Sequence, residues 1–226
     1  MERETLISCE GLYVGYDGKS VAGPIDLTVE TGDFLSIVGE NGAGKTTFVK
    51  TLLKLIKPIS GKIHFSQNFG SGGIGYVPQK DAIAPDFPAS VWETVISGCL
   101  AGLGSRFFYR EADKAKARSC LEKTGLSGLE RRSYKSLSGG QQKRALIARA
   151  LCAANCALLL DEPAAGLDEE AEADLHSVVR MLNDKGLAII MVTHDKAAAL
   201  EHSNKVLHIG QSAFLENVRG IGGEAQ

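Results

Sequence analysis

A glycine-rich stretch, Gly39-Glu-Asn-Gly-Ala-Gly-Lys-Thr46, constrains the fold of this chain most strongly, because it matches the pattern G-x-x-x-x-G-K-[ST]. A continuous apolar run at residues 34–38 precedes it and predicts a buried strand. Residues 45–55 follow and predict a helix that ends before Lys57 and Pro58. Between a strand and a helix, such glycines let successive backbone N–H groups point at one anion, and the helix N-terminus adds a favourable dipole. The pattern therefore predicts a site for the phosphates of a nucleotide.

An acidic pair follows a second apolar run. Residues 157–160 predict a strand, and Asp161 and Glu162 come directly after it. Because ligands of open α/β sheets bind at the carboxyl ends of the strands, this pair is expected beside the phosphate loop. Asp161 is then placed to hold Mg²⁺ through water, and Glu162 to polarise an attacking water as a general base. In the loop itself, Lys45 is expected to reach the β and γ phosphates, and the Thr46 hydroxyl to bind Mg²⁺.

Strand and helix patterns divide the chain into an α/β core and a helical insertion. Alternating apolar residues predict a strand at residues 25–29, and shorter apolar runs predict strands at 63–65, 74–77, 157–160 and 188–192. Helical patterns cover residues 91–98, 110–123, 140–153 and 171–182. Strands that alternate with helices and are apolar on both faces favour a parallel sheet covered by helices. The helical insertion runs from about residue 80 to residue 154, and only a tail is expected after Gly210.

The composition argues against several other classes of protein. The 25 basic and 27 acidic side chains give a net charge of −2, which provides no reason to expect nucleic acid as a partner. No apolar run approaches the ~20 residues that a membrane-spanning helix needs. The first residues lack the basic and apolar regions of a signal peptide, and the five scattered cysteines do not suggest a disulfide framework. These features are typical of a folded cytosolic protein.

A further motif, Leu137-Ser-Gly-Gly-Gln141, opens the predicted helix that precedes Asp161. Together with the phosphate loop and the acidic pair, it resembles the signature of the ATPase subunits of ATP-binding cassette (ABC) transporters, and the resemblance covers nearly the whole chain. It implies an α/β fold: a P-loop NTPase core, in which helices flank a mixed sheet, with an antiparallel β subdomain and a helical ABC subdomain. Within one ABC ATPase domain, 1–226, the core with its β subdomain would take residues 1–79 and 155–226, and the helical signature subdomain residues 80–154.

Four more residues match motifs of the family in the same order along the chain. By this resemblance Tyr16 is placed like the aromatic residue that stacks on adenine, and Gln79 like the glutamine that contacts Mg²⁺ and the γ-phosphate. Asp168, in Ala165-Gly-Leu-Asp168, resembles the loop residue that crosses a dimer interface. His194 matches the switch histidine, which would hydrogen-bond the γ-phosphate and orient the water.

The resemblance implies ATP and Mg²⁺ as cofactors. It makes Lys45, Gln79, Glu162 and His194 the catalytic residues. It makes Thr46, Gln79 and Asp161 the ligands of Mg²⁺. Besides Tyr16, Lys45, Thr46 and Asp168, the nucleotide-binding residues that it implies are Gly39, Glu40, Asn41, Gly42, Ala43, Gly44, Thr47, Ser138, Gly140 and Gln141.

Ser138, Gly139 and Gly140 form a second anion cradle at a predicted helix N-terminus. A single chain does not need two cradles for one triphosphate. The resemblance implies a head-to-tail homodimer, in which this cradle closes on the ATP that the phosphate loop of the other copy binds. Two ATP molecules would then lie at a two-fold interface.

Since no segment is expected to span a membrane, the family role implies a separate membrane permease and a position at the cytoplasmic face of the cell membrane. The expected docking surface follows Gln79 and includes residues 86–92, with Phe87 and Trp92. Residues 74–79, 86–88, 91–95 and 187–195 resemble the branch that takes up zinc, manganese or chelated iron. The resemblance favours import of zinc or manganese, with the metal selected by the permease and an extracytoplasmic substrate-binding protein.

Two alternatives remain open. One is the ATPase of another ABC system of similar size, with a different substrate or in cell division or lipoprotein extrusion. The other is a non-transport ABC ATPase of DNA repair or translation, although such proteins usually carry coiled-coil insertions or a second cassette. A phosphate-loop kinase or GTPase would lack the combination of Gln79, residues 138–141 and His194.

Overall fold

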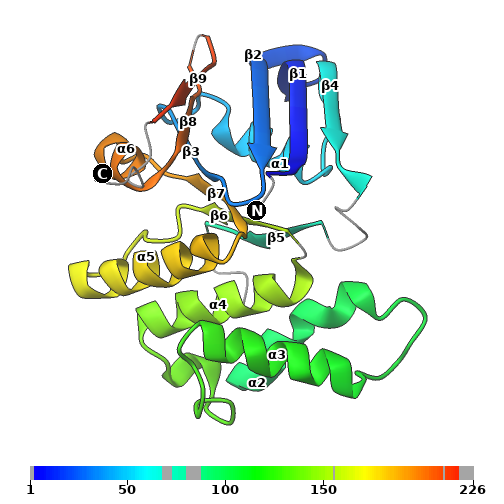
Figure 1. The fold of residues 1–226 in the computed structure, drawn as a ribbon, viewed down its shortest axis with the longest axis vertical. Helices are drawn as coiled ribbons and strands as arrows, with labels where there is room; N and C mark the ends of the chain where they lie inside the picture. Colours follow the sequence, from blue (N-terminus) through cyan, green and yellow to red (C-terminus); the bar gives the residue numbers. More distant parts are fainter. Residues whose placement is uncertain (1–2, 68–72, 80–87, 155, 211, 219–226) are drawn as a thin grey trace. The chain divides into compact units, whose positions relative to one another are not determined.

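The computed structural model describes residues 3–67, 73–79, 88–154, 156–210 and 212–218. The chain divides into two compact units, one of Met1–Asn68 with Ala188–Gln226 and one of Phe69–Leu187. Each unit combines strands with helices, as Figure 1 shows. None of the helices in the described ranges is long and apolar enough to cross a membrane.

The first unit contains an antiparallel sheet of three strands in the order β2-β1-β4. The strands are β1 (Thr5–Tyr16), β2 (Lys19–Glu30) and β4 (Ser60–Phe65). Ile25, Leu27 and Val29 of β2 are buried, as their alternation predicts. The apolar pattern does not predict β1, because its alternation breaks at Gly11. There the backbone has a φ of 51°, and the pairing with β2 shifts between Cys9 and Leu12.

The second sheet of this unit is mixed and carries the phosphate loop. It comprises β3 (Phe34–Val38), β7 (Ala188–Val192), β8 (Lys205–His208) and β9 (Phe214–Asn217) in the order β7-β3-β8-β9. The strands β7, β3 and β8 run parallel, and β9 is antiparallel to β8. Two helices accompany the sheets, α1 (Lys45–Leu52) and α6 (Lys196–His202). In α6, Ala199 packs on Val38 and Val206, so this helix covers β3 and β8.

A buried carboxylate ties the start of β3 to the start of β8. Asp33 is 0% exposed, and its Oδ2 accepts bonds from the Glu30 backbone N–H at 2.7 Å and from Lys205 Nζ at 2.7 Å. Its Oδ1 accepts a bond from Asn204 Nδ2 at 2.9 Å, and Asn204 Oδ1 in turn accepts the Phe34 N–H at 2.8 Å. Both carboxylate oxygens of Asp33 therefore have hydrogen-bond partners, which offsets the cost of burying this charge.

The second unit is built around α4. It contains a parallel pair of strands, β5 (Ile74–Val77) and β6 (Ala157–Asp161). Its helices are α2 (Val91–Ile96), η2 (Ser97–Gly102), α3 (Glu111–Lys123), η3 (Tyr134–Ser136), α4 (Gly139–Ala153) and α5 (Glu169–Asp184), of which η2 and η3 are 3-10 helices. Helix α4 contacts α2, η2, α3, α5 and β5. A Cβ at Gly75 would collide with the carbonyl of Ala150, and one at Gly98 with that of Arg149, so glycine permits both close approaches to α4.

The predicted α/β class with a mixed sheet, an antiparallel sheet and a helical part is confirmed. The expected bounds of β3, β5 and β7 agree with the structure. The expected helix at residues 45–55 ends at Leu52, because Lys54 adopts a φ of 58° and its ammonium lies over the Phe65 ring at 4.1 Å. The expectation of only a tail after Gly210 is wrong, since β9 pairs with β8 there. The boundaries 79/80 and 154/155 stay a prediction.

Asp33→Ala is expected to lower the free energy of unfolding by about 3 kcal/mol, because it leaves the Lys205 ammonium without its buried counter-charge. Urea unfolding followed by circular dichroism measures this loss. The control is Asp184→Ala, which removes an exposed carboxylate at the end of α5 and should change stability by less than about 0.5 kcal/mol. Equal effects of the two substitutions would show that the buried cluster does not support the sheet.

Candidate functional site

The phosphate loop, residues 39–46, joins β3 to α1. Gly42 and Gly44 have φ angles of 81° and 105°, a region that favours glycine. The Lys45 ammonium donates to the carbonyl oxygens of Gly39 at 2.7 Å and Glu40 at 3.0 Å, and the residue is only 7% exposed. The loop thus curls around the lysine that belongs to it. Since an ammonium has three N–H bonds and these carbonyls take two, one remains for a phosphate oxygen.

Other predicted residues of the loop differ in exposure. Thr46 is exposed at the first turn of α1, whereas Thr47 is buried. An added Cβ at Gly44 would lie 3.0 Å from that of Ala22, so β2 lies against the loop. Tyr16 pairs with Lys19 in the hairpin that leads into β2, and it is 44% exposed. The structure therefore places the predicted adenine-stacking residue on the hairpin that contacts the phosphate loop, with its ring open to solvent.

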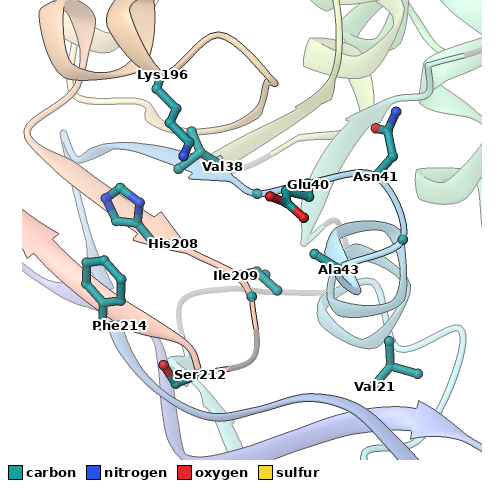
Figure 2. A pocket seen from close by; sticks show the side chains of 13 residues that line it. Val21, Val38, Glu40, Asn41, Ala43, Lys196, His208, Ile209, Ser212 and Phe214 are labelled. Carbon is teal, nitrogen blue, oxygen red and sulfur yellow. The ribbon is translucent and has the colours of Figure 1, made fainter.

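A pocket of about 670 Å³ borders residues 39–43 on the side of β8 and β9. Figure 2 shows Glu40 and Asn41 on one side of it and Lys196, His208 and Phe214 on the other. The rings of His208 and Phe214 stack at 4.4 Å with an angle of 8° between their planes. One edge of the phosphate loop therefore faces open space within this unit.

His194 follows β7 at the same end of the sheet as the phosphate loop, because β7 and β3 are parallel neighbours. The Thr193 N–H still bonds to the Ile37 carbonyl at 3.1 Å, and His194, the next residue, is exposed. Asp195 then caps α6 by accepting the N–H groups of Ala197 and Ala198 at 2.9 and 3.0 Å. The cap fixes the turn from which His194 projects.

The acidic pair lies in the second unit, where β6 ends. Asp161 is the last residue of β6 and is 6% exposed. Its Oδ2 accepts a bond from the Tyr76 hydroxyl of the neighbouring strand at 3.3 Å. Burial raises the pKa of Tyr76 to about 12, and the charge of Asp161 and the hydrogen bond to it add to the rise. Tyr76 therefore stays a neutral donor toward this carboxylate.

Glu162 has a φ of 47°, which is uncommon for a residue other than glycine. Its Oε2 accepts a bond from Gln79 Nε2 at 2.5 Å. The structure thus brings together two of the predicted catalytic residues, Gln79 and Glu162. A strained backbone beside a hydrogen-bonded carboxylate is a common feature of functional sites.

The donors of these groups suit magnesium. Thr46 offers a hydroxyl oxygen, Asp161 a carboxylate and Gln79 an amide oxygen, and Mg²⁺ prefers such hard oxygen ligands. Thr46 is exposed, and Asp161 Oδ2 accepts a bond from the Tyr76 hydroxyl. The residues present therefore fit this ion.

The signature segment, residues 138–141, begins α4 next to the start of α5. Ser138 Oγ accepts the Gln141 N–H at 3.3 Å, and Gln141 Oε1 accepts the Ser138 N–H at 3.1 Å, which is a capping box. Asp168 caps α5 by accepting the Ala171 N–H at 2.8 Å. An added Cβ at Gly140 would lie only 3.0 Å from that of Ala171. The structure therefore brings Ser138, Gly140 and Gln141 close to Asp168, at two adjacent helix N-termini.

The sequence profile of the ABC transporter family matches residues 22–165. The chain belongs to the ABC transporter family. It is 35% identical over 219 residues to the manganese transport system ATP-binding protein MntB of Bacillus subtilis, covering 94% of this chain and 88% of the relative. It is also 35% identical to the zinc import ATP-binding protein ZnuC of Marinobacter nauticus, covering 95% of this chain and 80% of the relative. A solved structure of a metal-chelate type ABC transporter in an inward-facing conformation matches with a TM-score of 0.85 and 29% identity, covering 95% of this chain and 84% of that one.

The chain carries the ATPase domain of this family. ABC ATPases bind ATP and generally require Mg²⁺, and ATP-binding subunits of the family form dimers and partner with membrane permeases. The expected docking stretch, residues 86–92, is described only in part, because residues 80–87 lie outside the described residues. In the described part, Trp92 is half-buried, and the Arg118 guanidinium lies 5.6 Å from its ring centroid.

Tyr76 is a neighbour of the acidic pair that the motifs alone did not reveal. Its contact with Asp161 depends on the pairing of β5 with β6, which places Tyr76 beside Leu159. The two strands are separated in sequence by the helical insertion, so only long-range pairing could have revealed the contact. The sequence offered one indication that Tyr76 lies near the site, its position in a predicted strand three residues before Gln79.

Gly44→Ala is expected to lower the stability of this ABC ATPase by about 1–3 kcal/mol, because the φ of 105° is unfavourable for a residue with a Cβ. The distortion should also weaken binding of a fluorescent ATP analogue, since the backbone N–H groups of the loop would turn away. Urea unfolding and fluorescence titration measure both effects. Gly102→Ala is the control, because its added Cβ meets no atom within 4 Å and its φ is not in the left-handed region. Unchanged nucleotide binding in Gly44→Ala would argue against residues 39–46 as the phosphate site.

Proposed function

We propose that this ABC ATPase hydrolyses ATP to drive the import of a metal ion, zinc or manganese, through a separate membrane permease. The observation that carries the proposal is the 35% identity, over 94–95% of the chain, to the ATP-binding proteins of a manganese transport system and a zinc importer. The metal is cargo in this proposal. An extracytoplasmic substrate-binding protein would deliver it to the permease, and the ATPase would lie at the cytoplasmic face of the membrane.

The proposed phosphate site is the loop at residues 39–46. Lys45 would keep its bonds to the carbonyls of Gly39 and Glu40 and direct its remaining N–H at the oxygens of the β and γ phosphates. The backbone N–H groups of the loop and the N-terminus of α1 would bind the remaining phosphate oxygens. Tyr16 would stack on adenine with its exposed ring. The other proposed contacts from this part of the chain are Asn41, Gly42, Ala43, Gly44 and Thr47.

Thr46, Gln79 and Asp161 are the proposed ligands of Mg²⁺, which neutralises charge on the phosphates when bound. Glu162 is the proposed general base, and His194 the residue that positions the water. In the structure Gln79 donates to Glu162, so the Oε2 atom of this carboxylate is occupied by an amide donor instead of a water. If Gln79 turned its amide toward the nucleotide, Glu162 Oε2 would be open to a hydrogen bond from the attacking water, whose proton the carboxylate would then accept.

The adjacent N-termini of α4 and α5 support a role for the signature segment in a second copy of the chain. The cap residue Ser138 leaves backbone N–H groups of the first turn of α4 for an anion, and no acidic side chain lies in that turn. We propose that Ser138, Gly140 and Gln141 complete the ATP site of the partner in a homodimer and that Asp168 couples the two sites. Residues 80–154 would form the signature subdomain, and residues 1–79 with 155–226 the core.

Glu162→Gln is expected to reduce ATP hydrolysis at least about 100-fold while retaining ATP binding, because glutamine keeps the acceptor for Gln79 but cannot take a proton. The variant should shift from monomer to dimer in the presence of MgATP. Phosphate release and size-exclusion chromatography with light scattering measure the two effects.

Two further variants control this experiment. Glu170→Gln changes an exposed glutamate in the first turn of α5 and should hydrolyse ATP as the unchanged chain does. Lys45→Ala should abolish nucleotide binding and therefore dimer formation. Hydrolysis by Glu162→Gln at the normal rate would reject Glu162 as the general base.

Tyr76→Phe is expected to raise the Mg²⁺ concentration for half-maximal hydrolysis by about tenfold, because it removes a donor that orients the Asp161 carboxylate. Its stability should fall by only about 1 kcal/mol. Hydrolysis is measured across a Mg²⁺ titration at saturating ATP. Tyr109→Phe, a half-buried tyrosine of the helical part, is the matched control. An unchanged Mg²⁺ requirement would mean that Tyr76 does not position this carboxylate.

The cargo is tested by reconstituting the chain with its permease and binding protein in vesicles and measuring uptake of zinc and manganese. Uptake that depends on ATP and is lost in Glu162→Gln would support metal import. Active hydrolysis without uptake of either metal would direct the search to another ABC system.

A further inference from the structure

Two adjacent phenylalanines project from the helical part of the second unit. Phe107 is 92% exposed and Phe108 83%. They lie in the connection between η2 and α3, here named the aromatic loop, residues 103–110. Figure 1 shows this connection as a loop that extends beyond the helices η2 and α3 that it joins. Burying a phenylalanine is worth about 2 kcal/mol, so exposing two neighbours indicates a contact with something that is not water.

The aromatic loop is fixed at both ends by one guanidinium group. Arg106 Nε donates to the Leu103 carbonyl at 3.1 Å, and its Nη2 donates to the Gly102 carbonyl at 2.8 Å. Its Nη1 donates to Asp113 Oδ2 at 3.1 Å, and the same oxygen accepts the Arg110 N–H at 2.7 Å. Arg106 and Asp113 therefore hold the two phenylalanines outward on an ordered turn. A contact made by such a turn costs little conformational entropy.

The surroundings of the aromatic loop are basic. Residues 103–118 contain five basic and two acidic side chains, a net charge of +3 in a chain whose net charge is −2. The two acidic groups are paired, Asp113 with Arg106 at 3.1 Å and Glu111 with Lys114 at 2.7 Å. The positive excess thus comes from Arg110, Lys116 and Arg118, all of which are exposed.

We propose that the aromatic loop contacts an anionic lipid surface, with Phe107 and Phe108 entering the boundary between headgroups and acyl chains. Exposed aromatic residues beside arginine and lysine are the combination that binds such surfaces. Cytoplasmic loops of membrane proteins carry an excess of lysine and arginine, so a permease segment would repel this surface, whereas anionic headgroups complement it. This contact goes beyond the proposed function, because it requires neither ATP nor a metal cargo.

The test is flotation of the purified chain with two kinds of vesicle, one of phosphatidylcholine with phosphatidylglycerol and one of phosphatidylcholine alone. The unchanged chain should float with the anionic vesicles and much less with the neutral ones. The double variant Phe107→Ser with Phe108→Ser should bind the anionic vesicles at least about tenfold more weakly. Arg110→Gln with Arg118→Gln should reduce binding to anionic vesicles about fivefold or more, and less as salt rises.

Leu55→Ser is the matched control, since Leu55 is a 67% exposed apolar residue that lies after α1, outside the loop. It should bind vesicles as the unchanged chain does. All variants should retain circular dichroism and ATP hydrolysis, which separates failure of the lipid contact from failure of the proposed ATPase site. The proposal is overturned if the unchanged chain does not float with anionic vesicles, or if both phenylalanines can be replaced without loss of binding. It is also overturned if that double variant floats normally but no longer copurifies with its permease, which would make the loop a protein contact.

Discussion

The bonds from the Lys45 ammonium to the carbonyls of Gly39 and Glu40 set the geometry on which the rest of the site depends. They require the backbone to curl tightly, and only residues that tolerate positive φ, here Gly42 and Gly44, permit that curl without strain. The curled loop also needs a fixed first residue. The end of β3 provides it, because β3 is hydrogen-bonded on both sides, to β7 and to β8. The same parallel pairing brings the segment after β7, and with it His194, to the loop's end of the sheet.

In the second unit, the single helix α4 positions the candidate residues. Helix α4 begins at the signature segment and contacts every other long helix of the unit as well as β5. Its first turn lies against that of α5, where Gly140 faces Ala171. Ten residues later, the Ala150 carbonyl lies so close to Gly75 that no side chain would fit there. One rigid element therefore links two candidate parts of the site, the anion cradle and the strand that leads to Gln79.

The sequence allowed prediction of those elements whose signal is local. Continuous apolar runs predicted β3, β5 and β7, and the glycine pattern predicted the phosphate loop between β3 and α1. The strand β1 was not predicted because a bulge at Gly11 interrupts its alternation of apolar and polar residues. The strand β9 was not predicted because it is short and mostly exposed. The bond from Tyr76 to Asp161 and the left-handed φ of Glu162 were not predictable, since both depend on how distant segments pair. The roles of Tyr16, Gln79 and His194 came from the order of the motifs and not from physical pattern alone.

The hydrogen bond between Gln79 and Glu162 suggests how hydrolysis can depend on the state of the helical part. In the proposed mechanism, the amide occupies the oxygen that would accept a hydrogen bond from the attacking water, so Gln79 would have to withdraw before that water binds. Gln79 lies two residues after β5, and β5 packs closely on α4, where Gly75 lies against the Ala150 carbonyl. Under the proposed mechanism, a movement of α4 caused by a contact at its signature end would therefore reach the donor that bonds to Glu162. This route needs no long chain of contacts, only one helix, one strand and one side-chain amide.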